Sequence, residues 1–332
     1  MRPPARWIRR VLLAPLTVVI ALGLVATVPL WVLVTLALSP FTSGRQRPLR
    51  LIWLATVYLL VEATMLLAMF GMWLSAGFGA GVRGPVFQRA HYRLCAWALR
   101  ILYRQARWVL KLTVEIEGTA PDALPDRPLL VLSRHAGPGD SFLLAHALIN
   151  WYAREPCIVL KDNLQWDPMI DVMLNRLPSR FIVPGAGQQS EQQIGNLAAG
   201  LDGDDALVIF PEGGNFTPER WERGIDRLRR LGFTRLARRA ARMRNVLPPR
   251  TGGVLAALSA SPQASVVLVA HTGVDHLLTI ADVWRELPMD KTIAMRWWLV
   301  EPVDIPSDPD GRVDWLYAWW GRVDGWISKQ KA

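Results

Sequence analysis

The amino-acid sequence predicts an α/β protein in which an N-terminal two-helix membrane hairpin precedes an α/β domain with a central, mostly buried sheet. Two observations predict this fold. The first third of the chain contains two long apolar runs with hardly any charge. The remainder alternates short apolar runs, typical of buried strands, with helical stretches. We therefore place the anchoring hairpin in residues 1–82 and the second domain in residues 83–332, with a basic linker helix at residues 87–106.

Composition narrows the class of protein. Of the 332 residues, 51% are hydrophobic and 20% are charged, which excludes a disordered chain. The two cysteines, Cys95 and Cys157, are too few for a disulfide scaffold or a four-cysteine zinc site, and we expect no metal. The net charge of +10 invites a nucleic-acid partner, but residues 1–111 hold 14 Lys and Arg against one acid, whereas residues 112–332 hold 24 against 27. The positive excess belongs to the membrane-like part, so we expect no nucleic-acid partner.

The two apolar runs are long enough to span a bilayer. The first extends from Val11 to Leu38, and no charge occurs between Arg10 and Arg45. The second extends from Leu51 to about Gly79, with Glu62 as its only charge. A bilayer core takes about 20 helical residues, so the pattern favours a hairpin over two buried helices of a soluble protein. An intramembrane carboxylate can be functional, but we assign Glu62 no role.

Flanking charge predicts the orientation of the hairpin. If both runs cross the membrane, their outer flanks lie on one side, and those flanks carry more arginine than the connecting turn. The positive-inside rule then predicts an integral protein of the cell (inner) membrane whose large domain is cytoplasmic. Pro15 and Pro29 leave open a hairpin that dips into one leaflet only. The basic amphipathic stretch from Phe87 to Lys111 suits either an anionic lipid surface or packing on the next domain.

Beyond the hairpin, apolar runs predict the strands of the sheet, and the stretches between them predict helices. Helical stretches occur at Ser141–Ala153 and Ser190–Ala199. The expected strands are Trp108–Ile116, Leu129–Leu132, Ile158–Leu160, Ala206–Phe210 and Ser265–Ala270.

The stretch PLLVLSRHAGPGDSFLL contains the first candidate site. A strand leads into a turn that His135 and Asp140 bracket as His-x4-Asp. Histidine is the usual general base near neutral pH, and a carboxylate across a tight turn can hold one ring nitrogen while the other faces a substrate. The alternative is structural, because Asp140 also stands where the N-cap of the following helix belongs.

The stretch ALVIFPEGGNFTPER contains the second candidate site. A buried strand ends before Glu212, Gly213 and Gly214, and ligands of α/β sheets bind at strand ends. The amides of a Gly-Gly turn can hold an anionic oxygen, and Glu212 can bind hydroxyls or orient an arginine. The alternative is a plain turn that ends the strand.

Taken in order, these motifs resemble those of the glycerolipid acyltransferases of the lysophosphatidate acyltransferase (1-acyl-glycerol-3-phosphate acyltransferase) family. The resemblance extends over roughly residues 107–275, and an N-terminal membrane hairpin is common in that family. It rests on His135 and Asp140, on Lys161, Leu164 and Pro168 followed by Arg180-Phe181-Ile182, on Phe210-Pro211-Glu212-Gly213, and on the strand Val267–Ala270.

The resemblance implies an acyltransferase domain, in which His135 and Asp140 activate the hydroxyl of a lysoglycerophospholipid for attack on an acyl thioester. The expected acceptor is 1-acyl-glycerol-3-phosphate, giving phosphatidate. The co-substrate is acyl-CoA or acyl carrier protein, no bound cofactor is needed, and membrane lipids are the other partners. Alternatives are another lysophospholipid or glycolipid acceptor, or a non-catalytic membrane lipid-binding protein. The oligomeric state stays open. The expected substrate-binding residues are Glu212, Gly213, Gly214, Lys161, Arg180 and Arg250.

Two departures from the family pattern bear on the acceptor. The usual serine two residues after the histidine is Gly137, and the arginine that is taken to hold the acceptor phosphate is replaced by Pro184. Proline cannot bind phosphate through its side chain or its missing N–H. We expect Arg180, Lys161 or Arg250 to replace the missing arginine, or else an acceptor without a terminal phosphate.

Two segments lie outside the motifs. Arg220–Arg250 contains eleven arginines and two acids, which suits anionic headgroups or phosphates, RNA, or simply a solvated helical face. The tail Val313–Ile327 carries four tryptophans, which favour either a membrane interface or a protein core.

Overall fold

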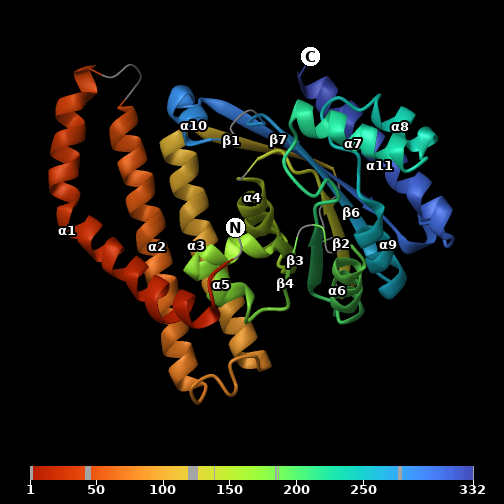
Figure 1. The fold of residues 1–332 in the computed structure, drawn as a ribbon. Helices are drawn as coiled ribbons and strands as arrows, with labels where there is room; N and C mark the ends of the chain where they lie inside the picture. Colours follow the sequence, from red (N-terminus) through yellow and green to blue (C-terminus); the bar gives the residue numbers. More distant parts are fainter. Residues whose placement is uncertain are drawn as a thin grey trace. The chain divides into compact units, whose positions relative to one another are not determined.

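The computed structural model describes residues 3–41, 46–118, 126–137, 139–183, 185, 187–275 and 279–331. Figure 1 shows the fold. The chain divides into two compact units, which we describe separately. The hairpin unit consists of residues 1–113, 160–184 and 279–291, and the sheet unit consists of residues 114–159, 185–278 and 292–332.

A seven-stranded, mostly parallel sheet confirms the predicted fold class. Its strand order is β1-β7-β6-β2-β5-β3-β4. The central strand β2 pairs in parallel with both β5 and β6, while β7 is antiparallel to β6. The strands are β1 (Leu112–Gly118), β2 (Leu129–Ser133), β3 (Glu155–Lys161), β4 (Arg180–Ile182), β5 (Asp205–Ile209), β6 (Ser265–Thr272) and β7 (Lys291–Val300).

The central strands are mostly apolar because both faces of the sheet are covered. Every residue of β2, β5 and β6 is buried. Alternate side chains of β2 enter different cores: Leu130 and Leu132 pack with the helices α6, α9 and α11, and Leu129 and Val131 pack with α4 and η4. The helices of the sheet unit are α4 (Asp140–His146), η4 (Ala147–Trp151), α6 (Gln188–Ala199), α7 (Pro218–Arg230), α8 (Thr234–Ala240), α9 (Thr251–Ala260), η6 (Pro302–Asp304) and α11 (Pro309–Lys331).

Two strand predictions need correction. The expected strand Trp108–Ile116 is wrong at its start, because helix α3 continues to Leu110 and only then does Lys111, with a φ of +54°, turn the chain into β1. The sequence analysis also missed β7. Burial in β7 alternates instead of being continuous, so the strand lacks the uniform apolar run that marked the others.

The C-terminal tail belongs to the core of the sheet unit. The tail lies in the 23-residue helix α11, which packs against β6, α8 and α9. Trp320 is completely buried and Trp326 is buried, while Trp315 and Trp319 pack partly buried against the same core. The tryptophans therefore fill a protein interior, and the membrane-interface alternative is wrong.

The arginine-rich segment forms two amphipathic helices. Trp221, Ile225 and Leu228 of α7 and Ala240 of α8 pack into the core of the sheet unit. Most of the arginines on the same helices are exposed. Each of these helices thus buries an apolar face in the core and exposes a cationic face to solvent. Its docking on anionic headgroups stays a prediction.

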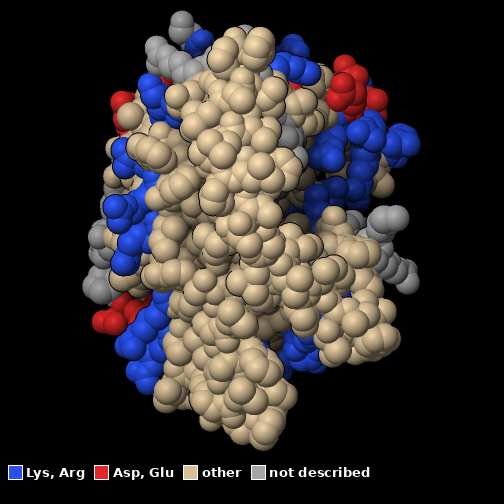
Figure 2. Space-filling model, turned by 90° about the vertical axis from the view of Figure 1, so that its left-hand side faces the viewer, with Lys and Arg blue, Asp and Glu red and all other residues tan. Residues whose placement is uncertain are grey.

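The hairpin unit holds two helices that are long and apolar enough to cross a membrane. These are Ile8–Phe41, with mean hydropathy 2.6, and Arg47–Ser75, with mean hydropathy 2.0. Most apolar side chains of the first helix are exposed, and Figure 2 shows that the face over α1 carries almost no charge. A continuous exposed apolar face favours contact with lipid. The unit contains η1 (Ile8–Leu13), α1 (Ala14–Leu38), η2 (Ser39–Phe41), α2 (Arg47–Ser75), α3 (Pro85–Leu110), η5 (Asp162–Trp166), α5 (Pro168–Leu174) and α10 (Ile280–Glu286).

Buried polar contacts attach both long helices to α5. Asp171 of α5 is fully buried and accepts hydrogen bonds from Arg9 at 2.8 Å and Arg10 at 3.2 Å. The hydroxyl of Tyr58 on α2 donates to Asp167 at 2.7 Å. Glu62 is buried on the same helix, which packs on α5. Because a buried charge is costly without its partner, these contacts fix how the hairpin docks on α5.

Trp320→Ala is expected to lower the free energy of unfolding by about 3–5 kcal/mol, because the variant leaves a cavity in the core. Denaturation of the detergent-solubilised protein, followed by circular dichroism, measures the change. Lys329→Ala, an exposed position on the same helix, is the control and should change stability by less than about 0.5 kcal/mol. Equal stability of the two variants would contradict the assignment of α11 to the core.

Candidate active site

The candidate site lies where the carboxyl ends of three parallel strands meet. His135 follows β2 by two residues, and Glu212 follows β5 by three. The register pairs Ser133 of β2 with Val269 of β6, so His135 is level with His271. Neighbouring strands lie about 4.8 Å apart, which brings these side chains within reach of one another.

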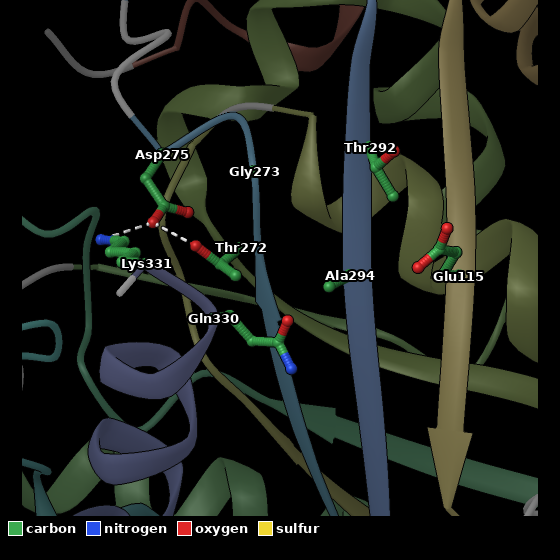
Figure 3. Close-up of a pocket in the computed structure, with 8 residues that line it drawn as sticks. All are labelled: Glu115, Thr272, Gly273, Asp275, Thr292, Ala294, Gln330 and Lys331. Atoms are coloured by element: carbon green, nitrogen blue, oxygen red, sulfur yellow. Dashed lines mark hydrogen bonds and ion pairs between the residues drawn. The ribbon is translucent and has the colours of Figure 1, made fainter.

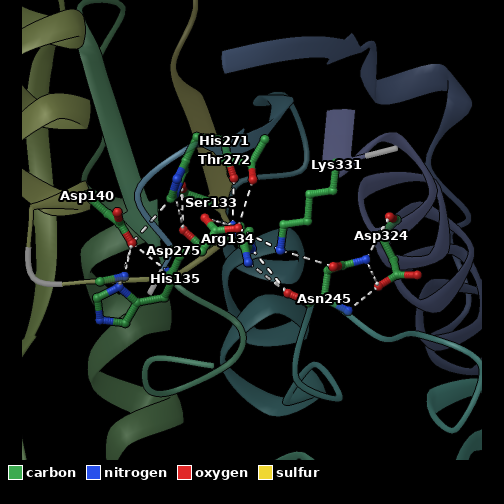
Figure 4. Close-up of polar contacts among 12 residues, drawn as sticks. Ser133, Arg134, His135, Asp140, Asn245, His271, Thr272, Asp275, Asp324 and Lys331 are labelled. Atoms are coloured by element: carbon green, nitrogen blue, oxygen red, sulfur yellow. Dashed lines mark hydrogen bonds and ion pairs between the residues drawn. The ribbon is translucent and has the colours of Figure 1, made fainter. Parts of the chain in front are cut away.

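The structure brings His135 and Asp140 together (Figure 4). Nδ1 of His135 lies 3.5 Å from Oδ2 of Asp140. The same oxygen accepts hydrogen bonds from the backbone N–H groups of Ala136 at 2.5 Å and Gly137 at 2.6 Å. Asp140 is the first residue of α4, whose N-cap is Gly139. Its carboxylate thus closes the turn behind His135 and does not cap the helix.

The surroundings of Asp140 keep its carboxyl group ionised. Burial by itself would raise the pKa of Asp140, but His271, the contact with His135 and the N–H of Gly137 outweigh burial and lower it. Within the part of the chain that the structure describes, Nδ1 of His135 has no hydrogen-bond partner. A proton on Nδ1 therefore has this carboxylate as its nearest acceptor, which leaves Nε2 for a substrate.

Glu212 holds the backbone of the loop that contains His135 through hydrogen bonds. Its side chain is buried, and its two oxygens accept backbone N–H groups of His135 at 2.9 Å and Leu247 at 2.8 Å. Burial raises the pKa of Glu212 to about 8, although both N–H groups act in the opposite direction. With both oxygens occupied by the backbone, Glu212 positions His135, and its expected contact with substrate stays a prediction.

The exposed side chain of Arg250 lies beside the turn that follows Glu212. Gly213 has a φ of +68°, and a Cβ at this position would lie 2.9 Å from Cζ of Arg250. Only glycine allows the Arg250 side chain to lie this close to the turn. The N–H of Arg250 donates to the carbonyl of Pro211 at 2.8 Å. Its guanidinium forms no ion pair with any residue that the structure describes. Gly214 is buried in the same turn.

The remaining expected binding residues lie outside this cluster. Lys161 ends β3 and Arg180 begins β4, and both belong to the hairpin unit. Arg180 is exposed and donates to the carbonyl of Ser179 at 3.0 Å. Pro184 lies outside the described residues. A role for Lys161 or Arg180 in substrate binding therefore stays a prediction.

Sequence reasoning missed a buried arginine network beside His135 (Figure 4). Arg134 is 1% exposed, and its guanidinium donates to the carbonyl of His271 at 2.7 Å and to that of Asn245 at 3.0 Å. It also pairs with Asp275 at 2.7 Å, and Lys331 near the end of α11 reaches the same carboxylate at 2.8 Å. The signal was available, since an arginine next to a buried strand needs several acceptors. Its partners are distant in sequence.

A polar cavity adjoins this network (Figure 3). Its volume is about 510 Å³, and neither His135 nor Asp140 lines it. Asp275 connects the two, because it lines the cavity, accepts a hydrogen bond from Thr272 at 2.8 Å and pairs with Arg134. The lining residues are Glu115, Thr272, Gly273, Asp275, Thr292, Ala294, Gln330 and Lys331.

Comparison with known proteins finds one family model that matches the segment carrying the site. Residues 113–272 match the family model described as Acyltransferase. The matched segment contains His135, Asp140, Glu212, Arg250 and His271. No curated protein and no solved structure matches the chain. The match supports an enzyme that transfers acyl groups.

The stability contributed by Glu212 should depend on pH. The pKa is raised from 4.5 to about 8 in the folded protein, so the folded state holds the proton more tightly and stability is lost as Glu212 ionises. The melting temperature of the wild type, relative to Glu212→Gln, is expected to fall between pH 5 and pH 8.5. Glu222→Gln at an exposed position is the control and should show a constant difference. A difference that stayed constant from pH 5 to pH 8.5 would mean that Glu212 is already ionised in the folded protein at pH 5, which would contradict the raised pKa.

Proposed function

We propose that this acyltransferase domain moves a fatty acyl group from an acyl thioester to the hydroxyl of a lysoglycerophospholipid. The acceptor that we favour is 1-acyl-glycerol-3-phosphate, which would give phosphatidate. One observation carries the proposal: His135 faces an ionised, buried Asp140 through Nδ1 and has its other ring nitrogen available, at a strand end within the matched segment.

The proposed reaction is a direct transfer. Nε2 of His135 takes the proton from the acceptor hydroxyl while Asp140 stabilises the imidazolium. The resulting alkoxide attacks the thioester carbonyl, and a tetrahedral intermediate forms. Collapse of this intermediate makes the ester, breaks the carbon–sulfur bond and releases a thiolate, which takes the proton from His135. No acyl-enzyme forms, because the hydroxyl attacks the thioester itself.

The donors for the oxyanion must come from outside the turn of His135. The N–H groups of Ala136 and Gly137 already bind Asp140, so neither is available to a tetrahedral intermediate. The N–H of Gly213 already donates to the carbonyl of Phe210 at 3.0 Å, so the N–H of Gly214 and the guanidinium of Arg250 beside this turn are our remaining candidates.

Arg250 is our candidate for holding the acceptor phosphate. The family arginine is replaced by Pro184, so another cation is needed for a phosphate-bearing acceptor. Arg250 is exposed and forms no ion pair with any described residue, and partial desolvation of its guanidinium together with the charge of Arg227 lowers its pKa. A phosphate is negatively charged, so an arginine in this position can bind it through charge-assisted hydrogen bonds. Another lysophospholipid or glycolipid acceptor is the alternative if no cation replaces the family arginine.

We further propose that the enzyme is an integral protein of the cell membrane with its catalytic domain in the cytoplasm. The two long apolar helices support membrane association, and the arginines that flank the hairpin support the cytoplasmic side. Acyl-CoA and acyl carrier protein are both thioester donors of the required chemistry.

His135→Ala is expected to lower turnover by roughly 100- to 10,000-fold, because the general base is removed. The assay measures thiol release from acyl-CoA or acyl carrier protein by the detergent-solubilised protein, with 1-acyl-glycerol-3-phosphate, other lysophospholipids or no acceptor. Glu222→Gln is the control and should keep full activity. Wild-type turnover that persisted in His135→Ala would refute the role of His135, and a wild type inactive with every acceptor and both donors would refute the transfer itself.

Arg250→Gln is expected to raise the KM for a phosphate-bearing acceptor by roughly 10- to 100-fold, since a charge-assisted hydrogen bond contributes about 1.5–3 kcal/mol. The KM for the thioester donor should stay unchanged. Arg238→Gln, which removes an exposed arginine from α8, is the matched control. An equal rise in acceptor KM in both variants would indicate a general surface-charge effect and would exclude a dedicated phosphate contact.

A further inference from the structure

A single carboxylate oxygen lies between two imidazole rings (Figure 4). Oδ2 of Asp140 is 3.5 Å from Nδ1 of His135 and 3.6 Å from Nε2 of His271. Nε2 of His271 also lies 3.0 Å from the carbonyl oxygen of Arg134, the residue before His135. A carbonyl oxygen only accepts hydrogen bonds, so Nε2 of His271 carries a proton. That N–H therefore holds the backbone of the His135 turn while facing the carboxylate.

Strand register places His271 in this position. Continuing the pairing of Ser133 with Val269 by two residues makes His271 the partner of His135 across the parallel strands β2 and β6. The side chain of His271 is only 4% exposed. It cannot reach a substrate in bulk solvent or act as the general base, so its influence must pass through Asp140 and the turn.

The charged groups around this cluster come from the ends of three strands. Arg134 follows β2 and donates to the carbonyl of His271, while Asp275 follows β6 and neutralises Arg134. Glu212 follows β5, and the charge of Asp140 adds to the burial that raises the pKa of Glu212. On the antiparallel side, His271 pairs with Met295 of β7, which is uncharged. His271 is thus the one group from β6 that faces the Asp140 carboxylate among the residues that the structure describes.

We propose that His271 is a positioning residue of the acyl-transfer site, whose Nε2–H fixes the Asp140 carboxylate and the Arg134 carbonyl so that His135 is held in its reactive orientation. This inference rests on the proposed function. The first of these contacts keeps Asp140 ionised as the acceptor for Nδ1 of His135. The second anchors the backbone immediately before the catalytic ring.

The test compares two substitutions of His271 whose side-chain amides differ in length. The side-chain nitrogen of His271→Gln can occupy the position of Nε2, whereas that of His271→Asn falls short, near the position of Nδ1. Because both variants bury one amide, they change the polarity of the site equally. His271→Gln is expected to retain kcat within about threefold. His271→Asn is expected to lose roughly 10- to 100-fold in kcat, because it leaves the buried Arg134 carbonyl without its hydrogen bond and removes the contact with Asp140. The KM for both substrates should stay unchanged in both, since His271 touches neither.

A pH profile separates positioning from a general structural defect. Without the Nε2–H, Asp140 holds its proton to higher pH and attracts the His135 proton more strongly, so both effects shift the acidic limb of kcat/KM to higher pH. The limb is expected to move in His271→Asn and not in His271→Gln. Equal limbs, equal kcat values or a KM change in the two variants would overturn the proposal.

A second measurement keeps this test distinct from the proposed reaction. Titration of the histidine ring carbons by NMR, in the full-length protein labelled with 13C-histidine, reports the pKa of His135 without any turnover, with the resonance assigned through His135→Ala. A higher His135 pKa in His271→Asn than in His271→Gln supports the coupling even if no acceptor is turned over, a result that would refute the proposed function alone. Identical His135 titrations in the two variants would overturn the coupling even if acyl transfer is observed.

Discussion

Parallel pairing of β2 with both β5 and β6 is the constraint on which the site depends. Parallel strands end at the same edge of a sheet, so the segments that follow them meet there. The register of β2 and β6 puts His135 level with His271, and the turn after β5 brings Glu212 beneath the backbone of His135. These strands are buried throughout, and alternate side chains of β2 pack into two different cores, so a shift of register by one residue would put each side chain into the wrong core. The core therefore fixes the geometry of the candidate catalytic residues.

Two buried carboxylates at this edge have opposite properties. Asp140 gathers two backbone N–H groups and two imidazoles, and these lower its pKa in spite of burial. Glu212 binds two backbone N–H groups, yet burial dominates and raises its pKa to about 8. A buried carboxylate stays charged only where enough donors replace water. In the mechanism we propose, the negative charge of Asp140 stabilises the imidazolium of His135. Glu212 fixes the backbone conformation of the loop that contains His135.

Distant parts of the sheet unit reinforce the same turn. Arg134, at the end of β2, contacts Asn245, His271 and Asp275. The backbone N–H of Asn245 in turn donates to the carboxylate of Asp324 on α11 at 2.6 Å. The tryptophans of α11 complete the core that supports β6. A helix that looked peripheral thus stabilises the backbone around His135. Within the hairpin unit, the buried Asp171 plays a comparable part, since it attaches the start of the first long helix to α5.

The sequence by itself determined the fold class, most strands, the apolar hairpin helices and the pair His135 and Asp140, because each depends on a pattern that is local along the chain. Continuous apolar runs revealed β2, β5 and β6, and a five-residue turn brought the dyad together. Only the tertiary structure decided that Glu212 braces a loop, that the α11 tryptophans are core and that His271 faces Asp140. The same holds for β7, whose alternating burial follows from its place beside β6. These features depend on strand order and register, which pair residues far apart in the sequence and leave no periodic signal in either partner.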